Sequence, residues 1–129
     1  MKAEIIAIGT EVLMGQVVNT NAAFISQSLS ELGIDLYYHT VVGDNPDRIK
    51  KVFQIALDRS DLIIFSGGLG PTKDDISKSI VADTLGLEVW EDQETLAEIK
   101  EIYQRSNRPM PASNVNQALI IENLSLIHI

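Results

Sequence analysis

The residues best suited to chemistry in this chain lie in one glycine-rich segment, SGGLGPTKDD at positions 66–75. An apolar run at 62–65 precedes it and an amphipathic stretch at 76–85 follows, which predicts a turn from a buried strand into a helix. Glycines leave backbone amides uncovered, and the helix start adds free N–H groups and the positive end of its dipole, so the segment predicts a phosphate cradle. Because Asp74 and Asp75 would repel a bare phosphate, we expect a divalent cation such as Mg²⁺ between them and the ligand.

The same residues also have a purely structural interpretation. The spacing differs from that of a P-loop, and no G-x-G-x-x-G occurs in the chain. A glycine-rich turn in which Asp74 or Asp75 caps the following helix would explain the pattern without a ligand. The local sequence leaves both interpretations open.

The elements around this segment alternate between strand and helix patterns, which indicates an α/β fold. Asn19 or Thr20 is expected to cap one helix, and Asn45 followed by Pro46 another. Helices are expected to end at glycines 33 and 86, and a further helix to begin near residue 92. The predicted strands cover residues 5–8, 34–42 and 62–65, the last of them apolar throughout and so expected in the centre of a parallel sheet.

Three loops follow these strands, at residues 9–15, 43–44 and 67–75. In an open parallel sheet, ligands bind beyond the carboxyl ends of the strands. The three loops are therefore expected to meet at one edge of the sheet and to form the ligand site together.

Composition limits the classes of protein that remain. A chain of 129 residues is one domain at most, and the absence of cysteine excludes disulfides and thiolate metal sites. No segment reaches the roughly 18 apolar residues of a membrane span, and no secretory signal is seen, so we predict a cytoplasmic protein without a membrane partner. The net charge of −8 argues against direct binding of nucleic acid.

Five segments of the chain form an ordered set: AIGTEVLMG at 7–15, VNTN at 18–21, VGDN at 42–45, GGLGPTKDD at 67–75 and NVNQA at 114–118. This set resembles the CinA (competence/damage-inducible protein) family, whose N-terminal domain is molybdopterin-binding-like. The MogA and MoaB proteins share the GG-x-G-P core. The resemblance implies a three-layer α/β/α molybdopterin-binding-like domain with a mainly parallel sheet. It covers residues 1–123 and implies a domain that is incomplete at its C-terminus.

The last residues, LSLIHI at 124–129, do not look like the family. They resemble the translation of a sequencing adapter and are interpreted as a non-native tail. A natural apolar strand is the alternative.

The resemblance also implies roles for individual residues. Asp75 and Asp44 would be catalytic and, with Asp74, would hold the divalent metal. The remaining candidates would bind phosphate or other parts of the ligand: Gly67, Gly68, Gly70, Thr72, Glu11, Asn19 and Asn21. Simpler roles remain open for several of them, namely an Asx turn or helix cap for Asp44, a solvated loop carboxylate for Glu11, and helix caps for Asn19 and Asn21.

The activity implied by the resemblance is metal-dependent hydrolysis of a nucleotide pyrophosphate of the ADP-ribose type. One alternative is binding or adenylylation of molybdopterin. The other is a non-enzymatic module for dimerisation or partner binding in competence. The expected partner is accordingly a nucleotide or a pterin, with a homodimer for the full-length protein.

Overall fold

The computed structural model describes residues 1–73 and 75–122. The chain divides into two compact units, the first from Met1 to Gly68 and the second beginning at Leu69, and each is described by itself. The first contains β1 (Lys2–Ile8), α1 (Thr10–Leu13), α2 (Thr20–Glu31), β2 (Asp35–Val42), α3 (Pro46–Arg59) and β3 (Leu62–Ser66). The second contains α4 (Ser77–Leu85), β4 (Val89–Glu91), α5 (Gln93–Arg105), the 3₁₀ helix η1 (Ala112–Ala118) and β5 (Leu119–Ile121).

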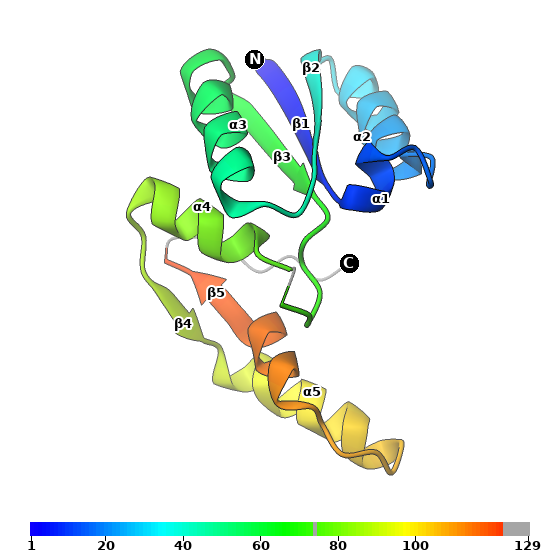
Figure 1. Ribbon diagram of the computed structural model, residues 1–129, viewed down its shortest axis with the longest axis vertical. Coiled ribbons are helices and arrows are strands. Elements are labelled where there is room, and N and C mark those ends of the chain that lie inside the picture. Colours follow the sequence, from blue (N-terminus) through cyan, green and yellow to red (C-terminus); the bar gives the residue numbers. More distant parts are fainter. Residues whose placement is uncertain (74, 123–129) are drawn as a thin grey trace. The chain divides into compact units, whose positions relative to one another are not determined.

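The first unit is a three-layer α/β/α arrangement, as the sequence predicts. Its sheet has the order β2-β1-β3, and both strand pairs are parallel. The chain passes from β1 to β2 on one side and then crosses back to β3 on the other. Because such crossovers are right-handed, they place successive helices on opposite faces, and Figure 1 shows α2 and α3 on the two sides of the sheet.

The central strand of this sheet is β1, which corrects the expectation that residues 62–65 would be central. All of β1 from Ala3 to Ile8 is buried, whereas every residue of β3 is only half-buried. Within the described residues β3 pairs with β1 alone, so one of its edges has no strand beside it. An unbroken apolar run indicates apolar neighbours on both faces, but it does not indicate two neighbouring strands.

Helix α3 covers one face of the sheet with the apolar stripe that the sequence predicts. Ile49, Phe53 and Ala56 are buried. The rings of Phe53 and Phe65 meet edge to face with centroids 5.0 Å apart, so α3 is fixed against β3 by a favourable aromatic pair.

A carboxylate lies in the middle of this apolar strand. Glu4 is fully buried in β1 and accepts hydrogen bonds from Arg59 Nε at 3.0 Å, Arg59 Nη2 at 2.7 Å, Thr40 Oγ1 at 3.1 Å and Ser60 Oγ at 3.1 Å. The guanidinium also lies 3.6 Å from the ring centroid of Tyr38. Burial alone would raise the pKa of Glu4, but these hydrogen bonds and the charge of Arg59 outweigh it and lower the pKa below its ordinary value of 4.5.

The predicted helix boundaries are confirmed at their caps. Asn19 accepts from the Ala22 amide at 3.0 Å and Asn45 accepts from the Arg48 amide at 3.0 Å, with Pro46 in the first turn. Asp92 does the same for Thr95 at the start of α5. Glycines 33 and 86 adopt the positive φ values expected at helix ends, 70° and 67°.

In the second unit, β4 and β5 form an antiparallel pair. Lys78 on α4 ties this unit together, because its Nζ donates to the backbone oxygens of Asn116 at 3.3 Å, Gln117 at 3.1 Å and Leu119 at 2.9 Å. Burial lowers the pKa of Lys78. No helix in the described part of the chain is both long and apolar enough to cross a membrane.

Candidate functional site

The first unit carries a pocket where its topology changes direction. The chain leaves β1 for β2 on one side, and β3 joins β1 on the other, so the carboxyl ends of β1 and β3 flank the switch point of the sheet. A cavity of about 180 Å³ lies there, lined by Ala7 and Ile8 of β1 and by Ser66 and Gly67 at the end of β3. Open parallel sheets bind their ligands at this position.

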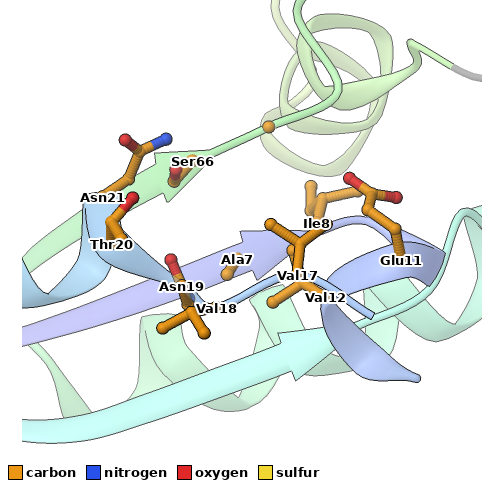
Figure 2. Close-up of a pocket in the computed structure, with 11 residues that line it drawn as sticks. Ala7, Ile8, Glu11, Val12, Val17, Val18, Asn19, Thr20, Asn21 and Ser66 are labelled. Carbon is orange, nitrogen blue, oxygen red and sulfur yellow. The ribbon is translucent and has the colours of Figure 1, made fainter. Parts of the chain in front are cut away.

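Two further segments, residues 11–12 and 17–21, complete the pocket walls, as Figure 2 shows. Glu11 and Val12 come from α1, and the connection to α2 contributes Val17 and Val18. The start of α2 contributes Asn19, Thr20 and Asn21. Valine side chains thus provide an apolar wall, while one carboxylate, two amides and two hydroxyls provide polar contacts.

The glycine at the end of β3 is required by backbone packing. Gly67 has φ of 94°, and a Cβ built on it would lie 2.1 Å from the carbonyl oxygen of Ile8. Gly68 follows with φ of 65°. The turn therefore passes directly against the end of β1, and only glycine permits this close approach.

A second glycine makes room for a carboxylate. A Cβ on Gly9 would lie 2.7 Å from Oε1 of Glu11. The Glu11 carboxylate therefore folds back over the first residue after β1, where it lines the pocket. The predicted loop at 9–15 contains the short helix α1, which projects Glu11 and Val12 into the site.

Asp44 joins the loops that follow β1 and β2. Its Oδ2 accepts from Thr10 N at 3.2 Å and from Thr10 Oγ1 at 2.9 Å, and its own amide donates to Thr10 Oγ1 at 3.3 Å. Asn45, and not Asp44, caps the helix that begins at Pro46. The alternative that Asp44 caps the helix at Pro46 is therefore wrong, and its carboxylate lies at the ligand edge without lining the pocket.

The second unit contains the rest of the glycine-rich segment. Asp75 Oδ2 accepts from Thr72 Oγ1 at 2.6 Å and from Thr72 N at 2.9 Å, and a Cβ on Gly70 would lie 2.6 Å from this same oxygen. The hydrogen bond from the Thr72 hydroxyl, with help from the amides of Thr72 and Gly70, lowers the pKa of Asp75 despite partial burial. The loop therefore closes on an ionised carboxylate.

The predicted turn from a strand into a helix is confirmed, because α4 covers Ser77–Leu85. Its N-cap, Ile76, makes no side-chain hydrogen bond to the helix start. Asp75 turns back to Thr72 instead of capping α4, so the capping interpretation is wrong for Asp75. Asp74 lies outside the described residues.

The structure thus brings together four of the predicted ligand residues, Glu11, Asn19, Asn21 and Gly67, in one pocket. Gly70, Thr72 and Asp75 form a second group in the other unit. Among residues 1–73 and 75–122, no three His, Cys, Asp or Glu side chains gather in a group that could hold a metal ion. A cation on Asp44, Asp74 and Asp75 stays a prediction, because Asp74 is not described and the other two lie in different units.

Thr10, Ser66 and the valines that line the pocket were not among the site residues predicted from the sequence. Ser66 had a usable signal, because it is the first polar residue after the apolar run and directly precedes the glycines. Thr10 had none beyond its place in the first loop, since its partner Asp44 is 34 residues away in the sequence.

A family model described as "Probable molybdopterin binding domain" matches residues 4–125. The "Putative competence-damage inducible protein" of Bacillus subtilis strain 168 is 52% identical over 126 residues, which are 98% of this chain and 30% of that protein. Its namesake in Listeria monocytogenes serovar 1/2a is 56% identical over 121 residues, 94% of this chain and 29% of that protein. The chain therefore spans about 30% of the length of the curated relatives that it matches.

Solved structures agree with this family. The crystal structure of the protein CinA from Thermoplasma acidophilum superposes with a TM-score of 0.82 and 36% identity, covering 94% of this chain and 70% of that one. The molybdopterin biosynthesis enzyme MoaB from Thermus thermophilus superposes with a TM-score of 0.62 and 23% identity, covering 93% and 78%. At that identity, the second likeness shows the fold alone.

Proposed function

We propose that this chain, which belongs to the molybdopterin-binding domain family and to its CinA group, binds a phosphorylated pterin of the molybdopterin type. The ligand would occupy the pocket between the ends of β1 and β3. The ring system would lie in the pocket and the phosphate would lie beside the backbone of Gly67 and Gly68.

The position and make-up of the pocket carry this proposal. It lies at the switch point of a parallel sheet, and it combines an apolar wall with converging polar groups, as small-molecule sites do. Its volume of about 180 Å³ is small for a complete nucleotide but sufficient for a planar ring system. The backbone at Gly67 and Gly68 carries no side chains, so a phosphate can approach it closely.

Calorimetric titration with neopterin monophosphate, which joins a pterin ring to one phosphate, tests the proposal. Asn21→Ala removes an amide from the pocket rim, and we expect affinity to fall about tenfold. Gln54→Ala, on the exposed face of α3, is the matched control and should leave affinity unchanged. The absence of binding to the wild-type chain would contradict the proposal.

One observation favours a second candidate function, the metal-dependent hydrolysis of a nucleotide pyrophosphate. The ionised carboxylate of Asp75 is held at the end of the glycine-rich loop, and carboxylates of this kind suit a hard cation such as Mg²⁺. When bound, the cation would polarise a phosphate and lower the pKa of a water molecule. Within the second unit, Thr72 would fix the Asp75 carboxylate through its amide and its hydroxyl, and the loop would hold a phosphate of the substrate.

The test of this second candidate is incubation of ADP-ribose with and without magnesium, with chromatographic quantification of the two products, AMP and ribose 5-phosphate. Asp75→Asn should lower a metal-dependent rate by at least about 100-fold, as expected for the loss of a main electrostatic group. Asp58→Asn, at an exposed position near the end of α3, is the control. No cleavage by the wild type, or equal cleavage by Asp75→Asn, would remove the hydrolase candidate and leave pterin binding intact.

A further inference from the structure

We infer that Glu11 sets the ring specificity of the pocket by accepting two hydrogen bonds from adjacent N–H groups of a planar heterocycle, the aminopyrimidinone edge found in pterins and guanine. The inference rests on the proposed function, since it assigns one edge of the proposed ligand to one side chain. The two adjacent N–H donors would distinguish this ligand from an adenine nucleotide.

The placement of Glu11 is built into the backbone. Gly9 has no Cβ where the carboxylate lies, and both carboxylate oxygens are within 3.1 Å of the position that a Cβ would take. Figure 2 shows Glu11 on one side of the pocket, with Asn21, Thr20 and Ser66 on the other. The carboxylate thus faces a cavity whose opposite side offers amide and hydroxyl groups.

The charge of the lining also favours a neutral ring over a phosphate. Of the eleven lining residues, all in the described part of the chain, Glu11 alone carries a charge. A phosphate beside this carboxylate would be repelled. The phosphate is better placed beside the glycine backbone at Gly67 and Gly68, and the uncharged ring in the cavity.

The acceptor-only nature of a carboxylate then selects the ring. An ionised carboxylate offers two oxygens and no hydrogen, so it complements two neighbouring donors. Pterin presents its 2-amino group beside N3–H, and guanine presents the corresponding pair. Adenine presents an amino group beside a bare ring nitrogen, which would face a carboxylate oxygen without a hydrogen between them.

The valine wall completes the selection of a flat ligand. Val12, Val17 and Val18 line the cavity, and Val18 has 81% of its surface exposed in this structure. A ring that stacks against this side chain removes apolar surface from water, which contributes affinity without fixing the orientation of the ring. Orientation is therefore left to Glu11.

Fluorescence titration of the full chain with pterin and lumazine tests the inference, because pterin carries an amino group at position 2 and lumazine carries an oxo group there. The wild type should prefer pterin by about tenfold or more, since lumazine sets a carbonyl against the carboxylate. Glu11→Gln offers one donor and one acceptor, which match the oxo group and N3–H of lumazine, so the preference should disappear or reverse. Glu31→Gln, exposed in the last turn of α2, should keep the wild-type preference.

Parallel titrations with GMP and AMP show whether the ring that carries the aminopyrimidinone edge belongs to a pterin or to a guanine nucleotide. If GMP binds more tightly than pterin and AMP binds more weakly than both, recognition of the aminopyrimidinone edge is supported and the ligand is identified as a guanine nucleotide. A pterin preference that survives in Glu11→Gln would overturn the inference and leave pterin binding by the pocket intact. No binding of any ring by the wild type would overturn the proposed function and the inference together.

Discussion

At the scale of single residues, glycines in this chain stand where neighbouring atoms need their space. A carboxylate oxygen of Glu11 lies where a Cβ on Gly9 would stand, and a carboxylate oxygen of Asp75 lies where a Cβ on Gly70 would stand. At Gly67, the backbone carbonyl oxygen of Ile8 lies where a Cβ would stand. In the first unit these glycines therefore place the Glu11 carboxylate and the turn after β3, and in the second unit Gly70 makes room for the Asp75 carboxylate.

Gly67→Ala tests this account of the turn. The added methyl group would lie 2.1 Å from the Ile8 oxygen and would occupy a left-handed backbone conformation. We expect a loss of at least about 3 kcal/mol in the free energy of unfolding, together with loss of neopterin monophosphate binding. The measurements are denaturant unfolding and calorimetry.

Gly33→Ala is the matched control for backbone strain alone. Its φ is 70°, and nothing lies within 4 Å of the added methyl group. This variant should lose only about 1–2 kcal/mol and should bind ligand as the wild type does. Equal losses in the two variants would show that the close approach to Ile8 is not what requires glycine.

The buried Glu4–Arg59 pair gives a second prediction at the residue scale. Arg59→Met would leave Glu4 buried without its charged partner, and we expect a loss of about 3 kcal/mol in the free energy of unfolding. This is the low end for such pairs, because 35% of the Arg59 side chain is exposed. Arg105→Met, which breaks an exposed pair with Glu101, should cost less than about 0.5 kcal/mol.

The same pair should make stability depend on pH. The pKa of Glu4 is lower in the folded than in the unfolded chain, so its contribution is fully present above the ordinary value of 4.5 and is lost as the pH falls through the lowered value. In Glu4→Gln this contribution is absent. The difference in unfolding free energy between wild type and Glu4→Gln should therefore shrink as the pH falls from about 5 to about 3, and a constant difference would contradict the assignment.

At the scale of elements, the sequence predicts what is encoded locally. The caps Asn19, Asn45 and Asp92 bond to amides three residues away, so each helix start could be predicted from a short window. The buried carboxylate at position 4 could not, because its partners Thr40 and Arg59 are 36 and 55 residues away. Strand order could not be read from apolar runs either, which is why β3 was expected in the centre of the sheet.

In the second unit, Lys78 makes another long-range contact that could not be predicted from the sequence. Lys78→Met would leave three backbone oxygens without their donor, and we expect the free energy of unfolding to fall by about 2 kcal/mol. Lys100→Met, exposed on α5, should change it by less than about 0.5 kcal/mol. Thermal unfolding of both variants makes the comparison, and similar melting temperatures would show that the Lys78 contacts are not stabilising.

At the scale of the whole molecule, the candidate site could be predicted as an edge but not as a pocket. The rule that loops after parallel strands meet at one edge correctly grouped Glu11 with Gly67. It could not show that Asp44 binds Thr10, or that Val17 and Val18 form a wall. Those features depend on how the connection between β1 and α2 folds over the sheet.

Mapping of a bound pterin onto the backbone amides by NMR tests the central claim most directly. On titration with neopterin monophosphate, the largest chemical-shift changes should fall on Glu11, Asn21, Gly67 and Gly68. Amides at the opposite end of the sheet, those of Lys2 and Asp61, should stay unchanged. Saturable changes confined to the first group are the predicted result, whereas changes centred elsewhere, or none at millimolar ligand, would contradict pterin binding at the carboxyl ends of β1 and β3.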